Sequence, residues 1–249
     1  MRPVPWWLTR PRKPRYAVPF RAGRPDAPAP ASRSRWPARE QLRDKGARGI
    51  GMRAVARAVD IPPSSLYRFY PDRAALLAEL RVDAYSSLIE QLTDARRTAG
   101  DRSPAGQWQA ITCALRGWAV DSPDQFGLLY SIPMHTEDEW TEPVYAQRAR
   151  AGSLVAGVVA DAMARSQLVP PPVGNPVAAL VPPWTSADGA PLDPVSIQIT
   201  LGAWAALVGH LSLEPHRRAM ILDPQAYYED FVRSVMVAMG FRPNAILRP

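Results

Sequence analysis

The sequence predicts an all-α protein, and three observations carry this prediction. Apolar residues recur at helical spacing through most of the chain from residue 52 to residue 239. Several of these runs open with Ser-Pro or Asp-Pro, in which the first residue caps a helix and the proline occupies its first turn. No segment alternates apolar and polar residues as a half-buried strand does. With 249 residues, 47% of them apolar, the chain can form one large domain or a small one joined to a medium one.

Residues 1–33 are expected to form a disordered, dispensable tail. They contain eight prolines and no periodic apolar face, so a helix there would lack both backbone donors and a side to bury. Four aromatic residues stand among the arginines, which fits either a weak stacking element or a start codon assigned too far upstream. They are Trp6, Trp7, Tyr16 and Phe20.

The positive charge of the chain is concentrated at its N-terminal end. The formal net charge is +7, but residues 1–49 hold 13 Lys or Arg against 3 Asp or Glu, which leaves +10 there and −3 in residues 50–249. A basic N-terminal region followed by a weakly acidic remainder indicates an anionic partner, either nucleic acid or an anionic membrane surface. A solvated tail without a partner is the alternative.

The first expected helix, over residues 34–45, is poor. Few of its residues are apolar, and these stand between charged residues and Pro37. A helix with so narrow an apolar face has little surface to bury against a neighbour. The residues that could form this face are Trp36, Ala38 and Leu42.

Two short helices separated by a tight break are expected next, at residues 52–59 and 64–70. The break is the run Asp60-Ile61-Pro62-Pro63. A long helix then runs from about Arg73 to Arg97, and Asp72 caps it because a carboxylate accepts hydrogen bonds from the free amides of a helix start. Two short helices joined in this way are the geometry of a helix-turn-helix, whose second helix enters the DNA major groove.

The run from Met52 to Leu77 contains the Leu66-Tyr67 pair, an aromatic-Pro break at Tyr70-Pro71, a basic residue two positions later and then Ala-Leu-Leu. In this combination it strongly resembles the signature of the TetR family of bacterial transcription regulators. The resemblance implies a helix-turn-helix DNA-binding domain over residues 34–80 and a helical domain for ligand binding and dimerisation over residues 81–249.

Three positions depart from the family pattern. Gly51 stands where a Ser or Thr cap is usual, and Pro62 replaces a capping Ser. Asp60 replaces the glycine expected in the turn, although Asp tolerates a left-handed backbone better than most residues. Together with the poor first helix, these changes leave an alternative open: a degenerate ligand-binding or interaction module that has lost specific DNA binding.

The second short helix is the expected recognition helix. Small hydroxyls allow close approach to base edges, and a guanidinium reads guanine or holds a phosphate. Phenols and a basic residue at the next helix start suit the phosphates beside the groove. For Tyr67, Tyr70 and Arg73 the alternative is packing or solvation, whereas Leu66, Val55 and Phe69 are expected in the core. The predicted DNA contacts are Arg53, Pro63, Ser64, Ser65, Tyr67, Arg68, Tyr70 and Arg73.

Five further helices are expected after residue 97. They start at Pro104, Pro123, Glu137, Pro194 and Pro224, and a Pro-rich loop over residues 169–192 follows the helix 137–168. The only cysteine, Cys113, permits no internal disulfide and no thiolate metal cage, which fits a reducing cytoplasm. The start does not resemble a signal peptide, and no run approaches the roughly 18 apolar residues of a membrane helix, so we expect a cytoplasmic protein without a membrane partner.

Two segments of the C-terminal region, Leu115–Ala119 and Ala203–Glu214, resemble the C-terminal domain of one large subgroup of TetR regulators, the WHG type. The resemblance implies that the last two helices pair with their copies in a second subunit. Small residues near Ala203 would allow close approach, and Phe231, Val235 and Met239 would supply an apolar stripe. Such a homodimer places two recognition helices about one DNA turn apart, roughly 34–36 Å, and reads a palindrome.

Bulky residues of the C-terminal region could line a cavity for an unknown small-molecule effector, although each could equally be ordinary core. They are Trp118, Tyr130, Met134, Trp140, Trp204 and His210. His210 and Glu214 lie one helical turn apart, a spacing that could hold a metal. Without a matching third ligand, a hydrogen-bonded polar pair is the better interpretation, and we expect neither metal nor cofactor.

An enzyme is not expected. The sequence has no phosphate-binding loop, nucleophile elbow or zinc-helix motif, and three histidines with one cysteine leave few catalytic arrangements. The predicted mechanism is ligand-controlled DNA binding, in which an effector tilts the long helix near Arg73 and changes the spacing of the recognition helices. That the regulator is a repressor is implied by the family resemblance alone.

Overall fold

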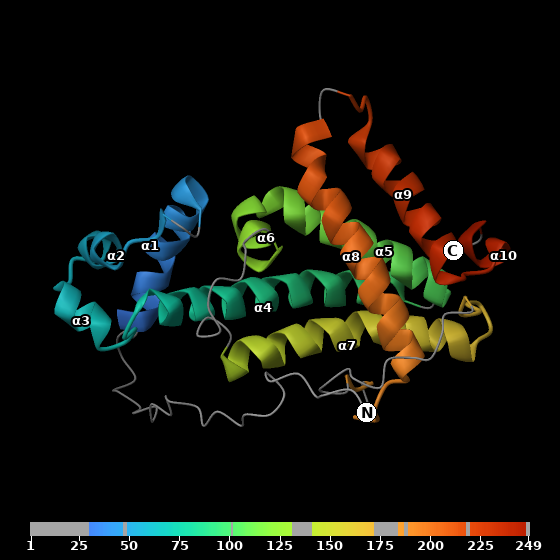
Figure 1. Cartoon of the computed structure of the whole chain (residues 1–249), viewed down its shortest axis with the longest axis horizontal. Helices are drawn as coiled ribbons and strands as arrows, with labels where there is room; N and C mark the ends of the chain where they lie inside the picture. The colour runs from blue at the N-terminus through green and yellow to red at the C-terminus, as the bar shows by residue number, and fades with distance from the viewer. Residues whose placement is uncertain are drawn as a thin grey trace, which may run out of the picture.

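The computed structural model describes residues 30–46, 49–100, 102–130, 141–171, 184–186, 189–217 and 220–247. This part of the chain forms ten α-helices and no β-strand, apart from two isolated bridges between Leu168 and Phe241 and between Thr185 and Pro191. The expected all-α class is confirmed (Figure 1). The helices are α1 Pro30–Lys45, α2 Met52–Ala58, α3 Pro63–Tyr67, α4 Arg73–Ala99, α5 Pro104–Asp121, α6 Pro123–Tyr130, α7 Glu142–Ala164, α8 Pro194–Arg217, α9 Pro224–Met239 and α10 Pro243–Leu247.

A small N-terminal unit is made of α1, α2, α3 and the start of α4, and it lies at one end of the molecule (Figure 1). Its core consists of buried apolar side chains that come mainly from these four helices. They are Ala38, Leu42, Ile50, Met52, Val55, Ala56, Leu66, Tyr70, Leu76, Leu77, Leu80 and Leu128. Ile50 and Tyr70 lie in the segments between these helices, and Leu128 belongs to α6 and not to the small unit.

Helix α1 begins at Pro30, earlier than the expected boundary at residue 34, and it packs well despite its sparse apolar residues. Ala38 and Leu42, one turn apart, are both buried in the core of the small unit, so this short apolar face suffices. The same stripe of α1 is also held by ion pairs to α4, with Arg35 and Arg39 at 3.1 and 3.0 Å from the Asp83 carboxylate. Burial alone would lower the pKa of Arg35, but Asp83 and the nearby Glu79 raise it on balance. The tail before residue 30 and the side chain of Trp36 lie outside the described residues.

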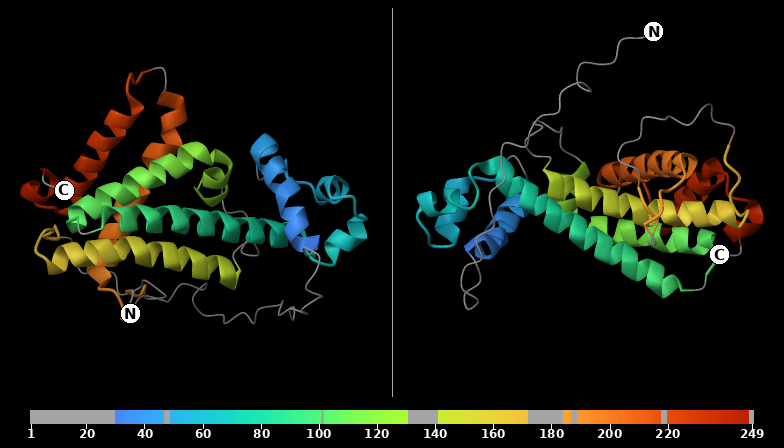
Figure 2. Two further views of the ribbon diagram at one scale, coloured as in Figure 1. Left: turned by 180° about the vertical axis from the view of Figure 1, so that it is seen from behind. Right: turned by 90° about the horizontal axis from the view of Figure 1, so that it is seen from below.

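The larger unit is built on α4, which continues from the small unit along α5 and α7 (Figures 1 and 2). Helix α8 crosses this layer, and α9 packs beside α8 on the side that holds the C-terminus. The core contains large, fully buried side chains from every layer, among them Leu88, Trp108, Leu115, Leu207 and Tyr228. The 27-residue α4 contributes buried side chains to both cores and so connects them through packing as well as through the chain itself.

Several boundaries follow the predicted caps. The Asp72 carboxylate accepts from the Ala75 amide at 2.8 Å, Ser103 Oγ from Gly106 at 3.2 Å, and Asp223 from Ala226 at 3.0 Å. Helix α9 ends at Gly240 as expected, with φ of 96° and its Cα so close to the Val169 carbonyl that a Cβ would stand 2.0 Å from the oxygen. Only glycine fits there.

Other boundaries differ from the prediction. Helix α7 ends at Ala164 instead of residue 168, because the chain turns at Ser166, with φ of 55°, and Leu168 bridges to Phe241. Helix α8 runs past Leu211 to Arg217, and α10 was not expected. Of the predicted loop 169–192, the described part includes Trp184, whose ring packs directly on Gly152 of α7.

Candidate DNA-binding interface and effector region

Helices α2 and α3 form the predicted helix-turn-helix. The backbone turns through Asp60, which adopts the left-handed φ of 54° that its position demands. The amide of Ile61 donates to Ala56 O at 3.1 Å, which closes the end of α2 before Pro63 starts α3. The substitution of Asp for the usual glycine is thus accommodated, since Asp tolerates this backbone region.

The recognition helix is oriented by one side chain that points inward. Leu66 is 1% exposed in the core of the small unit, and Val55 of α2 is fully buried beside it, as predicted. With Leu66 inward, the neighbouring positions of α3 face outward. Pro63 and Ser64 are exposed and Ser65 is half-buried, and Arg53 of α2 is exposed as well.

The end of α3 adds further exposed groups. Tyr67 is 44% exposed, and Arg68, which caps the helix, is exposed as well. Arg57 of α2 is also exposed, while the exposed acidic groups nearby are Asp60 and Asp72, and Asp72 is engaged as a cap. The described face is therefore predominantly cationic, which suits a polyanion.

Two aromatic residues exchange their predicted places. Tyr70 was expected to contact phosphate, yet it is 4% exposed and packs in the core of the small unit. Phe69 was expected in that core, yet it is 45% exposed. The physical reason is the end of α3: the amides of Phe69 and Tyr70 both donate to Leu66 O at 3.0 Å, a tight turn that directs Tyr70 inward and Phe69 outward. The sequence alone did not reveal where the helix ends.

Arg73 has a structural partner. Its Nε donates to Ile50 O at 3.2 Å, and the side chain is half-buried. This bond joins the first residue of α4 to the segment before α2. Gly51, the residue that caps α2, is held by its amide donating to Gln41 of α1 at 3.1 Å. The helix-turn-helix is thus tied to both of its neighbouring helices.

Three of the predicted effector residues come together between the helices of the larger unit. Trp118 is 4% exposed and donates to Ser87 Oγ at 3.1 Å, and Trp204 donates to the Tyr130 hydroxyl at 3.3 Å. Phe126 of α6 joins them, with ring centroids 6.5 Å from Trp118 and 5.2 Å from Tyr130. Burial raises the pKa of the Tyr130 phenol, so this hydroxyl remains neutral at ordinary pH.

Three other predicted residues are not part of this cluster. His210 is buried on the α9 side, stacked on Phe231 with a centroid distance of 4.3 Å. Met134 and Trp140 lie outside the described residues. Glu214, considered with His210 as a polar pair, instead accepts two bonds from Arg116 of α5, at 2.7 and 3.1 Å. Among the described residues, no group of three His, Cys, Asp or Glu could hold a metal ion.

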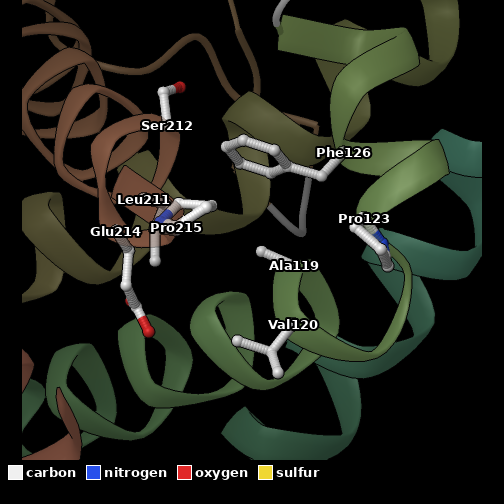
Figure 3. Close-up of a pocket in the computed structure, with 8 residues that line it drawn as sticks. All are labelled: Ala119, Val120, Pro123, Phe126, Leu211, Ser212, Glu214 and Pro215. Carbon is white, nitrogen blue, oxygen red and sulfur yellow. The ribbon is translucent and has the colours of Figure 1, made fainter. Parts of the chain in front are cut away.

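A cleft of about 220 Å³ lies beside the aromatic cluster, between the end of α5, the start of α6 and the end of α8 (Figure 3). Phe126 is the one residue that the cleft and the cluster share. Sequence reasoning missed this site, because its lining residues come from three helices and carry no motif. They are Ala119, Val120, Pro123, Phe126, Leu211, Ser212, Glu214 and Pro215.

The faces of α8 and α9 only partly match the predicted dimer surface. On α8, Gly202, Ala206 and Gly209 are exposed, whereas Ala203 is buried. On α9, Val235 and Met239 are buried and Phe231 is half-buried, all within their own subunit. The predicted apolar stripe of α9 therefore packs in the core, because a helix with one apolar face buries that face in its own chain first.

By length and composition alone, one helix of the described chain could cross a membrane, the segment Pro194–His216 of α8. Core helices of soluble proteins pass the same test. The segment contributes Ile199, Ala203, Leu207 and Leu211 to the larger core, which accounts for its apolar character.

Comparison with known proteins gives a consistent result. Residues 37–80 match the bacterial regulatory proteins of the tetR family, and residues 108–235 match the tetracyclin repressor-like C-terminal domain. The chain is 30% identical over 215 residues to the HTH-type transcriptional regulator Rv1816 of Mycobacterium tuberculosis, which covers 81% of this chain and 88% of that protein. The HTH-type transcriptional regulator Mb1846 of Mycobacterium bovis matches with the same values.

Solved structures share the fold. The regulatory protein SCO4313 superposes with a TM-score of 0.61 at 23% identity, over 83% of this chain and 95% of that one. A bacterial regulatory protein in the tetR family from Rhodococcus RHA1 superposes with a TM-score of 0.60 at 15% identity, over 87% of this chain and 100% of that one. The two-domain helical fold, both family matches and the 30% identity to curated regulators lead to one conclusion: the chain belongs to the TetR family of transcriptional regulators.

Proposed function

We propose that this regulator binds a palindromic DNA operator as a homodimer in the cytoplasm, and that a small effector bound in the larger unit controls this binding. The observation that carries the proposal is the orientation of α3. Its inward Leu66 leaves Ser64, Tyr67 and Arg68 exposed on a cationic face at the tip of the molecule. Small hydroxyls and a guanidinium at these positions suit base edges, and the phenol suits a phosphate.

The state of the small unit favours DNA binding over the degenerate-module alternative. That alternative depended on a poor first helix and on unusual turn residues. In the structure α1 buries Ala38 and Leu42, and Asp60 takes the required left-handed backbone. A packed small unit can present the recognition helix rigidly, which base recognition requires.

The exposed small residues of α8 support a dimer. Gly202, Ala206 and Gly209 lie one turn or less apart along one side of the helix, so another helix can approach closely there. On α9, Tyr227 and Val237 are exposed, 44% and 64%. A two-fold dimer through these helices sets the two recognition helices on one side of a duplex.

Coupling between effector and DNA needs an element that touches both units. Helix α6 contacts α4 and α5 and also reaches α1. Its Phe126 belongs to the larger core and its Leu128 to the small one, so a displacement of α6 would alter both. In the family-derived scheme, effector binding favours a spacing of the recognition helices that no longer fits the operator, and repression is lifted.

Selection of bound sequences from a random DNA pool tests the dimeric operator. We expect an inverted repeat whose half-site centres lie about 10 base pairs apart or a multiple of that spacing. The double variant Tyr67→Ala, Arg68→Ala should recover no motif. The matched control Tyr145→Ala, Arg150→Ala removes the same residue types from the exposed surface of α7 and should recover the wild-type motif. A single half-site without a repeat would contradict dimeric binding.

A further inference from the structure

We propose that the cleft between α6 and the end of α8 binds a small, uncharged, largely apolar molecule that carries an N–H or O–H donor and is not a carboxylic acid. The proposal rests on the effector-controlled DNA binding proposed above and specifies the site and the chemical class of the effector. It also moves the site away from the tightly packed Trp118, Tyr130 and Trp204.

The wall of the cleft is mostly hydrocarbon. Ala119, Val120, Pro123, Phe126, Leu211 and Pro215 supply it, and Figure 3 shows the Phe126 ring and the Ala119 methyl group facing the gap from the α5–α6 side. A volume of about 220 Å³ is below the range of about 300–1,000 Å³ typical of drug-sized ligand sites. One turn of a partner helix, about 10 Å in diameter with side chains and about 5.4 Å long, exceeds this volume. A single small molecule is the occupant that these dimensions fit.

The two polar side chains of the wall offer only hydrogen-bond acceptors. The Ser212 hydroxyl donates its hydrogen to Val208 O at 2.8 Å, so the oxygen that remains can only accept. Glu214 is a carboxylate, and each of its oxygens keeps acceptor capacity beyond its single bond from Arg116. A ligand with an N–H or O–H donor therefore gains a hydrogen-bond partner here. The oxygens of a carboxylate ligand would instead face acceptor oxygens and form no hydrogen bond.

The charge at the cleft favours an uncharged ligand. Glu214 is compensated by Arg116 in a pair whose side chains are only 11% and 15% exposed. Arg116 itself does not line the cleft, and it is held further by Gln225 of α9 at 2.6 Å. Because the pair is neutral as a whole and largely desolvated, a charged ligand would lose its hydration without gaining a counter-charge.

Occupancy of the cleft has a direct physical route to the DNA-binding unit. Phe126 forms part of the wall, and Leu128, two residues later on the same eight-residue helix, is 2% exposed in the core of the small unit. A ligand that fills the gap presses on α6 from the side of α8. Packed cores shift between discrete arrangements and do not deform continuously. A displacement of α6 therefore changes the positions of α1 and α4, which pack against it.

The binding test uses indole and benzofuran, two bicyclic probes of equal shape that differ in an N–H donor and an ether oxygen. Calorimetry and saturation-transfer NMR on the full chain should show indole binding, with benzofuran weaker by about fivefold, the factor of one net hydrogen bond. Ala119→Phe should abolish indole binding, because its ring occupies the cleft. Ser212→Ala, which adds no bulk, should weaken indole and leave benzofuran unchanged.

The matched control is Ala110→Phe on the same helix. Ala110 lines a separate hollow of about 300 Å³ between α4 and α5, bordered by Gln91 and Arg102 and not by α6. This variant should bind indole as the wild type does. It should also bind DNA as the wild type does, whereas Ala119→Phe, which mimics an occupied cleft, should lose DNA affinity by at least about tenfold while melting cooperatively.

The possible results separate the two proposals. Indole binding that is absent in the wild type, or unchanged in Ala119→Phe and Ser212→Ala, would overturn the cleft site. Equal DNA affinity in a folded Ala119→Phe variant would overturn its coupling to DNA. If none of the proteins binds DNA while indole still binds and is blocked by Ala119→Phe, the proposed function fails and the cleft site stands.

Discussion

The Arg73 guanidinium, at the first residue of α4, has a structural partner within the small unit. Its Nε bond to Ile50 O links α4 to the segment that precedes α2, and Ile50 is itself 3% exposed in the core. We infer that Arg73 positions the helix-turn-helix relative to α4.

Replacing Arg73 by Ala should therefore lower stability before it alters electrostatics. We expect a loss of about 1.5–3 kcal/mol in the free energy of unfolding, as for a hydrogen bond from a charged group, measured by urea denaturation. DNA affinity should fall, while the slope of log K against log salt stays as in the wild type. Unchanged stability with a slope smaller by about 1 would instead show that Arg73 contacts a phosphate.

The burial of Tyr70 and the exposure of Phe69 could not be predicted from the sequence. Both are aromatic, and both lie within one turn after the predicted recognition helix, so pattern alone could not decide which one is buried. The deciding fact is the double acceptance of amides by Leu66 O, which is a property of the backbone at the helix end. Inside a helix, spacing alone determines which side a residue lies on. Val55 and Leu66, predicted as core, are buried, and Ser64, predicted as outward, is exposed.

Helix α6, only eight residues long, packs in both the larger and the small unit. It closes the aromatic cluster of the larger unit through Phe126 and inserts Leu128 into the small unit. The sequence predicted the helix from its Ser122-Pro123 start but gave no indication that Leu128 would leave the core of its own domain.

Truncating Leu128 to Ala tests this connection. The side chain is 2% exposed, so we expect a loss of about 2–4 kcal/mol in the free energy of unfolding. Hydrogen exchange should accelerate in α1 and at the start of α4, and remain as in the wild type in α9. Acceleration confined to the larger unit would contradict the assignment of Leu128 to the core of the small unit.

The elements also show what sequence could and could not supply. The caps at Asp72, Ser103 and Asp223 are local, so they fixed helix starts within a residue. The packing of α1 depends on Asp83, 48 residues beyond Arg35, and the cleft depends on residues of α5, α6 and α8. The apolar stripe of α9 was wrongly assigned to the dimer interface. Periodicity shows that one face of a helix is buried, but it does not show whether the same chain or a second subunit covers that face.

On the scale of the whole molecule, the larger unit buries phenols that must stay neutral. Tyr228 donates to Thr112 O at 2.9 Å, and burial raises the pKa of Tyr228 and of Tyr130 well above the ordinary value near 10. Above that pH the unfolded chain releases phenolic protons that the folded chain retains.

The contribution of these two phenols to stability should therefore be constant below about pH 10 and fall as the pH rises past it, by up to about 1.4 kcal/mol per pH unit for each tyrosine. Chemical denaturation between pH 8 and 11 measures this. Tyr228→Phe should reduce the slope, since the variant has one fewer phenol to ionise in the unfolded chain. A slope equal to that of the wild type would mean that Tyr228 ionises alike in both states.

Fluorescence anisotropy with DNA from the protein's own upstream region can show whether the exposed face of α3 recognises DNA. We measure the wild type, the double variant Tyr67→Ala, Arg68→Ala and the matched control Tyr145→Ala, Arg150→Ala at several salt concentrations. We expect specific binding that only the first double variant loses, by at least about 30-fold, since two contacts of about 1–3 kcal/mol each add to at least about 2 kcal/mol. Weak, steeply salt-dependent binding that is the same in all three proteins would contradict it and assign the interaction to nonspecific attraction by the basic N-terminal residues.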